Sequence, residues 1–430
     1  MNLFESLEHI GNSRSVIAMI GQIERELVES EETNEDKRVF WSSIFRILVK
    51  SNADFQKILL DLAKDIDTVN LAPDTLEQIY GDKIYASVSS FERFYNCEYQ
   101  YFLENTLSLE TFENIDINSK IVGNFFHEVF EKVMKETDLS AENFDEKLTL
   151  VLQEVDKNYS RYFTQDATAR FTWSNLEEIV RQTATVLKVT VSTDELKTLL
   201  TESSFGLSKS ELGNFSVDDI YLRGRIDRLD QLSTDYLGVI DYKSSAHSFK
   251  LQEAYDGLSL QFMTYLDVIK QAFPNQKIWG ALYLQFKNQP INLSEINQLS
   301  EIANILKESM RYDGLVLEDA AEQIKGIENI ALKNTNSYNE EEFEQLLKLN
   351  EEHYRAAGQR LKNGKIAINP IMKRSEGIDQ SGNVRGCRYC PLKSICRFEA
   401  NIHMNEHSRE IGQKSQAEIL AELKGEGRDE

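Results

Sequence analysis

Apolar residues recur every three or four positions through much of the first half of the chain, a spacing that predicts amphipathic helices. The pattern is strongest in residues 119–136, "SKIVGNFFHEVFEKVMKE", and helices are also expected within residues 1–80 and 140–205. Residues 88–110 are rich in aromatic side chains and begin with serines, which are favoured helix caps. The first half of the chain is therefore expected to be mainly helical.

The pattern changes to alternation of apolar and polar residues beyond this point. Residues 218–232, "DDIYLRGRIDRLDQL", and 235–245, "DYLGVIDYKSS", are predicted to be strands of a β-hairpin. A helix is expected over residues 259–273 and another strand over 277–286, followed by an acidic, mostly helical stretch over 294–365. Together these elements predict an α/β fold.

The charge of the chain narrows the choice of function. It carries 48 Lys and Arg against 71 Asp and Glu, a formal net charge of −23 over 430 residues. Bulk charge therefore does not favour nucleic-acid wrapping, although a local cleft with metal ions and a few arginines stays compatible with DNA. The sequence shows no secretory leader and no run of 18 apolar residues, so we expect a cytoplasmic protein with no membrane partner. It also lacks the G-x-x-x-x-G-K-[ST] pattern of an ATP motor.

Two aspartates and a lysine are brought together by the predicted hairpin. Asp241 and Lys243 are two positions apart on one strand and so face the same side, and Asp227 lies on the partner strand. Converging carboxylates repel each other unless a cation lies between them, and Mg²⁺ prefers oxygen ligands. A lysine beside the metal can orient water or balance phosphate charge, so the trio indicates metal-assisted phosphodiester hydrolysis. A surface salt bridge is the simpler explanation of Asp-x-Lys taken alone.

Three further residues are weak signals individually. His127 lies on the polar side of the apolar helix 119–136, where a solvated histidine is more common than a ligand. Gln261 and Tyr265 are four positions apart on a predicted helix and share a face, which is usually a surface feature.

The four cysteines are a stronger signal. Three of them lie in "CRYCPLKSIC", spaced C-x2-C-x5-C, and the fourth precedes them by 387 − 97 = 290 residues. Four thiolates fit either tetrahedral zinc or an iron–sulfur cluster, which would close the domain like a staple. Disulfides are a poor default in a reducing compartment. The remaining alternative to a metal or cluster site is that the four cysteines are unrelated buried residues. The set is Cys97, Cys387, Cys390 and Cys396.

The order of these motifs resembles a known nuclease family. The segments "SVSSFERFYNC", "GNFFHEVFEKV", "GRIDRLD", "VIDYKSS", "QFMTYL" and "CRYCPLKSIC" are similar to the PD-(D/E)xK nuclease domain with an iron–sulfur staple. Within that group they most resemble the C-terminal part of the B subunits of AddAB/RexAB-type ATP-dependent helicase–nucleases, over about residues 75–400. The resemblance implies a restriction-endonuclease-like mixed sheet flanked by helices, with long helical additions and a four-cysteine cluster.

The resemblance also implies roles for individual residues. The metal ligands, for Mg²⁺ or Mn²⁺ in its place, would be His127, Asp227, Asp241 and the backbone carbonyl of Tyr242. Lys243 matches the catalytic lysine, and Gln261 and Tyr265 match a Q-x-x-x-Y motif near the DNA backbone. The four cysteines match the ligands of a [4Fe–4S] cluster.

The partners and the domain plan follow from the same resemblance. Family B subunits work on DNA with an A-type subunit that supplies the ATP-driven motor, resect double-strand breaks for recombination, and are assigned the 5′-ended strand. They are much longer than this chain, so residues 1–80 are expected to be the remnant of a helicase-like N-terminal part. The nuclease domain would occupy residues 81–405, with the helical insert 294–365, before a charged tail, 406–430, in which a frayed helix or an irregular end is expected.

Two other functions stay open at this point. A fragment of a heterodimer could serve as a scaffold that holds a partner or a DNA end without cutting it. CRISPR-associated nucleases share the cluster and the motif order, but they are usually shorter and lack a long acidic insert.

Overall fold

The computed structural model describes most of the chain beyond residue 68. The described residues are 39, 43, 44, 46, 47, 50, 69–110, 117, 119–136, 143–191, 196–232, 235–243, 247–285, 311–326, 332 and 335–425. The prediction of helices in residues 1–80 therefore lies mostly outside the described residues. None of the helices in the described ranges is both long and apolar enough to cross a membrane.

The chain divides into two compact units, which we call the sheet unit and the cysteine unit. The sheet unit comprises Ala72–Tyr95, Glu104–Gly364 and Gln413–Glu430. The cysteine unit comprises Met1–Leu71, Asn96–Leu103 and Lys365–Gly412.

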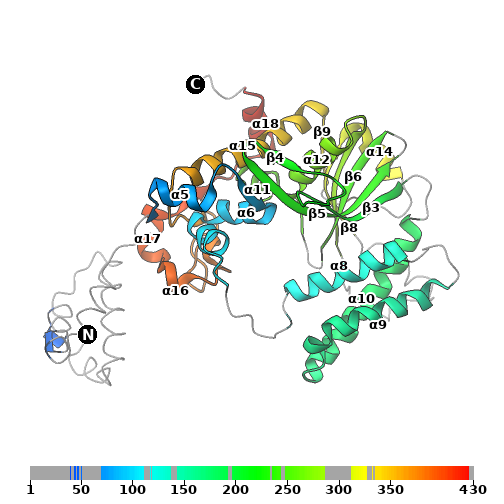
Figure 1. Cartoon of the computed structure of the whole chain (residues 1–430), viewed down its shortest axis with the longest axis horizontal. Helices are drawn as coiled ribbons and strands as arrows, with labels where there is room; N and C mark the ends of the chain where they lie inside the picture. The colour runs from blue at the N-terminus through cyan, green and yellow to red at the C-terminus, as the bar shows by residue number, and fades with distance from the viewer. Residues whose placement is uncertain are drawn as a thin grey trace. The chain divides into compact units, whose positions relative to one another are not determined.

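A mixed eight-stranded sheet forms the centre of the sheet unit (Figure 1). Its main path runs β2-β5-β6-β7-β8-β9, and β3 and β4 also pair with β5. Parallel pairs (β2 with β5, β6 with β7, β8 with β9) alternate with antiparallel ones (β5 with β6, β7 with β8). The strands are β2 (Ile84–Ser87), β3 (Leu196–Phe205), β4 (Phe215–Val217), β5 (Ile220–Leu232), β6 (Tyr236–Lys243), β7 (Lys277–Gln285), β8 (Arg311–Leu317) and β9 (Asn336–Tyr338).

Helices cover this sheet in two groups. α12 packs on β6, β7 and α15, while α8, α9 and α10 pack on one another, and α8 and α10 also contact β3 (Figure 1). The apolar stripe of residues 119–136 becomes α8, whose buried residues include Phe125, Val129 and Phe130. The described helices of this unit, of which α6 ends one residue beyond it, are α5 (Pro73–Tyr80), α6 (Val88–Asn96), α8 (Ser119–Glu136), α9 (Phe144–Phe163), α10 (Ala167–Val191), α11 (Leu251–Tyr255), α12 (Gln261–Ala272), α14 (Glu318–Gly326), α15 (Glu340–Lys362) and α18 (Gln416–Lys424).

Most of the predicted elements near the hairpin are confirmed. β5 and β6 pair antiparallel from Leu232↔Tyr236 to Arg228↔Ile240, as the alternation predicts. The helix expected over 259–273 is α12, and the strand expected over 277–286 is β7. The serine cap before α6 is also present, because the backbone N–H of Ser90 donates to Ser87 Oγ at 3.2 Å.

Two predictions of helical or tail structure are wrong in part. The stretch 294–365 contains helices α14 and α15, but β8 and β9 within it are strands of the central sheet. β8 pairs with β7 along most of its length, which satisfies backbone hydrogen bonds that no helix supplies there. Residues 406–430 are more than a frayed tail: α18 starts with a capping box between Ser415 and Glu418, and Ile419 on it is buried.

The cysteine unit contains only short elements in its described part. Two small sheets are formed by β1 with β10 and by β11 with β12. The elements are β1 (Val69–Asn70), α7 (Glu98–Tyr101), a π-helical turn that runs on past the unit (Phe102–Thr106), β10 (Lys365–Ile366), β11 (Ile371–Lys373), a 3-10 turn (Arg385–Cys387), α16 (Lys393–Cys396), α17 (Ala400–His407) and β12 (Arg409–Ile411).

Candidate active site

The β5–β6 hairpin places two buried carboxylates next to each other. Their strands pair as far as Arg228↔Ile240, and Asp227 and Asp241 are the next residues along. The Asp227 side chain is held by the opposite strand, because the backbone N–H of Tyr242 donates to its Oδ2 at 2.8 Å. Asp227 is 6% exposed and Asp241 1% exposed, so neither charge is well solvated.

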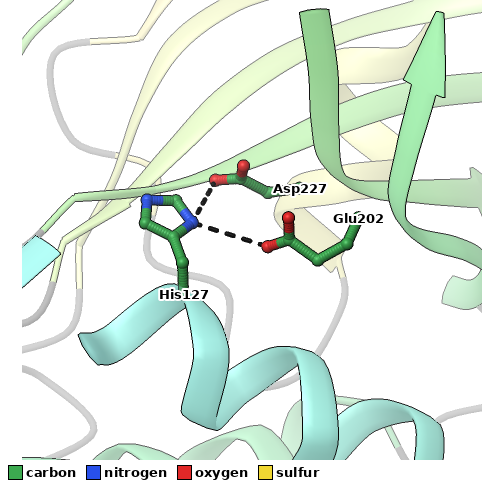
Figure 2. Close-up of side chains that lie close together, drawn as sticks. All are labelled: His127, Glu202 and Asp227. Carbon is green, nitrogen blue, oxygen red and sulfur yellow. Dashed lines mark ion pairs between the residues drawn. The ribbon is translucent and has the colours of Figure 1, made fainter. Parts of the chain in front are cut away.

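A histidine and a glutamate complete a cluster around Asp227. His127 Nδ1 lies 3.4 Å from Asp227 Oδ2 and 3.5 Å from Glu202 Oε1. One potential ligand atom from each of the three residues lies within 4.8 Å of the others, a spacing at which the three can hold a metal ion. Figure 2 shows His127 rising from α8 toward the two carboxylates, which come from the sheet. His127, which is only a weak signal in the sequence, thus lies at the predicted site.

Glu202 was missed because its segment was expected to be helical. Residues 196–205 form β3 instead, antiparallel to β5. A register shift between Thr198 and Leu200 interrupts the alternation that identifies a strand, and Glu202 has a φ of 49°, in the left-handed region that non-glycine residues rarely adopt. Irregular strand geometry of this kind is concentrated at functional sites, where it aims a side chain.

The electrostatics of the cluster favour a bound cation. Burial, and then the neighbouring charge of Asp241, raises the pKa of Asp227 well above its ordinary value. Burial lowers the pKa of His127, but its hydrogen bond to Glu202 and the charge of Asp227 raise it overall. Glu202 Oε1 is buried, and the His127 Nδ1 that faces it at 3.5 Å lies at the outer limit of hydrogen-bonding distance. Oxygen and imidazole ligands of this set fit a divalent metal ion, which would relieve the carboxylate repulsion.

Lys243 is fixed beside Asp241 rather than free in solvent. Its Nζ lies 2.6 Å from Asp241 Oδ2 and donates to Gln261 Oε1 at 3.4 Å. Burial lowers the pKa of Lys243, but the attraction of Asp241 raises it overall, so the amine is positively charged at neutral pH. A charged lysine at this position can bind a phosphate oxygen or orient a water.

The glutamine–tyrosine pair is connected to the same carboxylate. Gln261 Nε2 donates to Asp241 Oδ1 and to Tyr265 Oη, both at 2.9 Å. Tyr265 is only 6% exposed, and burial raises the pKa of its hydroxyl. In the structure, this pair therefore helps to fix the position of the Asp241 carboxylate. The DNA contact expected of Gln261 and Tyr265 remains a prediction.

The side chain and the backbone of Tyr242 have different surroundings. Its ring packs against Phe130 of α8 with centroids 5.5 Å apart, and burial raises the pKa of the hydroxyl to about 12. Its N–H holds Asp227 as described, and the expected role of its carbonyl as a metal ligand stays a prediction.

A second residue, Glu92 of α6, was also missed. One of its carboxylate oxygens accepts the backbone N–H groups of Leu260, at 2.8 Å, and Gln261, at 3.2 Å, at the start of α12. Burial raises the pKa of Glu92 to about 7, although these hydrogen bonds lower it in part. Because the contact joins residues 168 and 169 positions apart, no local pattern reveals it. Glu92 therefore anchors the helix that carries Gln261.

A sequence profile of the PD-(D/E)XK nuclease superfamily matches residues 85–397, a range that includes every residue of this site. The chain belongs to the PD-(D/E)XK nuclease superfamily. The correspondence of Asp227 and of Asp241-Tyr242-Lys243 to the acidic and (D/E)xK elements of that superfamily remains a prediction from the sequence.

Several helicase–nuclease proteins are similar to this superfamily member. It is 99% identical over 430 residues to the B subunit of the ATP-dependent helicase/deoxyribonuclease of Lactococcus lactis subsp. cremoris (strain SK11), and covers 39% of that protein. It is 98% identical to the exonuclease/helicase subunit RexB of strain MG1363, again covering 39%. The corresponding helicase/deoxyribonuclease protein of Streptococcus agalactiae (strain A909) is 31% identical over 411 residues, 94% of this chain and 36% of the relative. The chain thus spans less than two fifths of the length of these relatives.

The nuclease superfamily profile also includes the cysteine unit's four thiols, which share one pocket. Cys97, Cys387, Cys390 and Cys396 all line it, together with apolar side chains such as Leu103. None of the four is in a disulfide. Burial, and then the charges of the other three cysteines, raises the pKa of Cys387 to about 12. Thiols in such an environment are deprotonated only if a metal centre compensates their charge, so the donor set fits a metal or an iron–sulfur cluster.

Proposed function

We propose that this chain is the nuclease part of a helicase–nuclease B subunit and acts as a Mg²⁺-dependent deoxyribonuclease that cuts single strands. The observation that carries the proposal is the junction of two groups of residues at one end of the β5–β6 hairpin. His127, Glu202 and Asp227 form a candidate cation site, and Asp241, next to Asp227, is paired with Lys243.

The residues of the site would have different roles in hydrolysis. A divalent ion held by His127, Glu202, Asp227 and Asp241 would lower the pKa of water and neutralise charge that develops on the phosphate. Lys243, held in its charged form by Asp241, binds a phosphate oxygen or orients the attacking water. The side-chain amide of Gln261 donates a 2.9 Å hydrogen bond to Asp241 Oδ1. This bond fixes the orientation of the carboxylate, whose other oxygen faces Lys243.

The substrate and partner are inferred from the relatives and from the charge. Proteins 98% and 99% identical to this chain are named as helicase, deoxyribonuclease and exonuclease subunits, which favours a helicase–nuclease over a CRISPR-associated enzyme. We infer DNA made single-stranded by an A-type motor subunit as the substrate, with the 5′-ended strand assigned by family resemblance and with break repair by recombination as the process. Delivery of DNA by a motor partner also suits a chain with a net charge of −23.

The test of the proposed activity is cleavage of end-labelled single-stranded DNA with Mg²⁺, or Mn²⁺, and no ATP. Asp241→Asn preserves the shape of the side chain but removes its charge, and we expect it to reduce the rate by about 10³-fold or more while the protein stays folded. Full activity in Asp241→Asn would remove this carboxylate from the mechanism. A folded wild-type chain that does not cut, yet binds the motor partner, would support the scaffold function instead.

We also propose that the cysteine unit binds a [4Fe–4S] cluster. Support comes from the convergence of all four thiols on one pocket and from the family resemblance. Anaerobically purified protein should be brown and absorb visible light, with about four iron atoms per chain by analysis. A colourless protein with one zinc per chain would contradict the assignment and favour the tetrahedral alternative.

A further inference from the structure

A row of aromatic and basic side chains leads along the sheet to the metal site. It consists of Lys83 and Tyr85 next to and on β2, and of Tyr221, Arg223 and Arg225 on β5. We call these five residues the basic–aromatic ladder. We propose that the ladder binds the single-stranded polynucleotide that enters the active site. This inference rests on the proposed nuclease function.

The outer end of the ladder is an aromatic platform. Tyr85 and Tyr221 are paired across β2 and β5, their ring centroids are 5.3 Å apart, and the rings are tilted by 31°. The Nζ of Lys83 lies 4.8 Å from the centre of the Tyr221 ring. Tyr85 is 68% exposed and its ring lies against that of Tyr221, so the two tyrosines form one accessible aromatic surface. Bases of any sequence can stack on such a surface.

The middle of the ladder is positively charged. Arg223 and Arg225 are exposed, whereas Leu222 between Tyr221 and Arg223 is buried. Positions 221, 223 and 225 therefore share the outer face of β5. Two guanidinium groups on a chain with a net charge of −23 are locally complementary to a phosphate backbone.

The inner end of the ladder touches the metal site. Arg225 Nη1 lies 3.5 Å from Glu202 Oε2, and the other oxygen of Glu202 faces His127. From Tyr221 to Arg225 the strand advances about 13 Å. A strand of nucleic acid lying on the ladder would thus reach the site within a few nucleotides.

Single-stranded nucleic acid fits this surface better than a protein partner does. The ladder supplies ring faces and point charges in one line, the combination that tracks a flexible backbone and its bases. An acidic peptide would use the arginines but would leave the tyrosine platform without a role.

The test measures binding separately from cleavage. Fluorescence anisotropy with labelled oligo-dT in EDTA gives the Kd of the chain without turnover. We expect Tyr85→Ala to raise the Kd about 10-fold, since each base–aromatic stack contributes that much or more. Tyr85→Phe should bind like the wild type. Arg223→Gln should lower the slope of log Kd against log salt concentration by about 0.7, the value for one phosphate contact on a single strand.

Controls are available on the helical part of the sheet unit. Phe171→Ala removes another exposed aromatic residue, 67% exposed, and Arg161→Gln another exposed arginine. Both should leave the Kd unchanged. The proposal is overturned if Tyr85→Ala and Arg223→Gln bind as tightly as these controls, or if a blunt duplex binds more tightly than oligo-dT and loses as much affinity in the variants.

The two proposals fail in different ways. A wild-type chain that binds oligo-dT through the ladder but cuts nothing with Mg²⁺ would sink the nuclease and leave the ladder. A chain that cuts oligo-dT with an unchanged KM in Tyr85→Ala and Arg223→Gln would leave the nuclease and overturn the ladder.

Discussion

The two units of this chain bring their chemical groups together in different ways. In the sheet unit, Asp227 and Asp241 meet because paired strands put them side by side, and the backbone of Tyr242 holds one of them. In the cysteine unit, the described strands are two or three residues long and the four thiols converge from segments 290 residues apart.

The difference indicates what each unit needs in order to fold. Hydrogen-bonded register and a buried apolar core hold the strands that carry the carboxylates in place. In the described part of the cysteine unit, the strands are short and the apolar clusters around Val384 and Phe102 are small, so these residues supply less stabilisation of their own. An ion bound in the sheet unit would therefore serve chemistry, and a group bound by the four cysteines would serve folding.

The largest expected effect is on the cysteine unit. Cys97→Ser should prevent binding of the proposed cluster and free the loop that it would close, which would lower the free energy of unfolding by on the order of 4 kcal/mol by analogy with a cross-link. Reduced soluble yield, rapid limited proteolysis within residues 365–412 and loss of colour would show it. Tyr389→Ala, at a residue 91% exposed between two cysteines, is the matched control and should behave like the wild type. A stable, colourless Cys97→Ser protein would contradict a folding role.

The next effect concerns the residue that completes the carboxylate cluster. Glu202→Gln removes a charge from the metal site, and we expect about 10²-fold slower cleavage with weaker Mg²⁺ binding and an unchanged melting temperature. Glu211→Gln is the control. Glu211 accepts a hydrogen bond from Ser204, which lies on β3 like Glu202, but Glu211 is not part of the cluster. Equal effects of the two substitutions would exclude Glu202 as a ligand.

A smaller effect is expected from the anchor of α12. Glu92→Ala removes the acceptor for two N–H groups at the start of the helix, so Gln261 and Asp241 lose their fixed positions. We expect kcat to fall about 10- to 100-fold with KM nearly constant. Glu92→Gln, which keeps an acceptor oxygen, should recover most of the rate. A fall in KM and kcat alike, with a lower melting temperature in both variants, would mean that Glu92 is only structural.

The last prediction concerns the pH dependence of stability in the sheet unit, at a buried carboxyl outside the active site. Burial raises the pKa of Asp267 to about 8, and Asn350 donates to it at 2.9 Å. The folded state keeps this proton up to about pH 8, whereas the unfolded carboxyl loses it near 3.8, so the free energy of unfolding falls as pH rises through this window. Asp267→Asn should lose less free energy of unfolding than the wild type between pH 5 and pH 8, because it has no carboxyl proton to release. Denaturant melts would measure this, with the exposed Asp74→Asn showing the wild-type slope.

The sequence predicts the regular part of the site well. Alternation identifies β5 and β6, and the spacing of Asp241 and Lys243 places both at the site. The helical stripe of residues 119–136 identifies α8, from which His127 reaches Asp227.

The parts that were missed depend on tertiary structure. Glu202 lies on a strand whose alternation is broken by a register shift, so its segment was expected to be helical. Glu92 acts on backbone groups far along the chain. The strands β8 and β9 lie in an acidic region and become strands only by pairing with the sheet. Local patterns carry none of this information.

The central claim is that the carboxylate cluster holds a divalent ion for catalysis, and metal binding tests it most directly. Mn²⁺ can be titrated into the chain, with the free ion followed by electron paramagnetic resonance, for the wild type and for Asp227→Asn. We predict saturable binding at this site in the wild type, at least a roughly 10-fold weaker affinity in Asp227→Asn, and the same circular dichroism for both. Equal Mn²⁺ binding by the two folded proteins would contradict the claim.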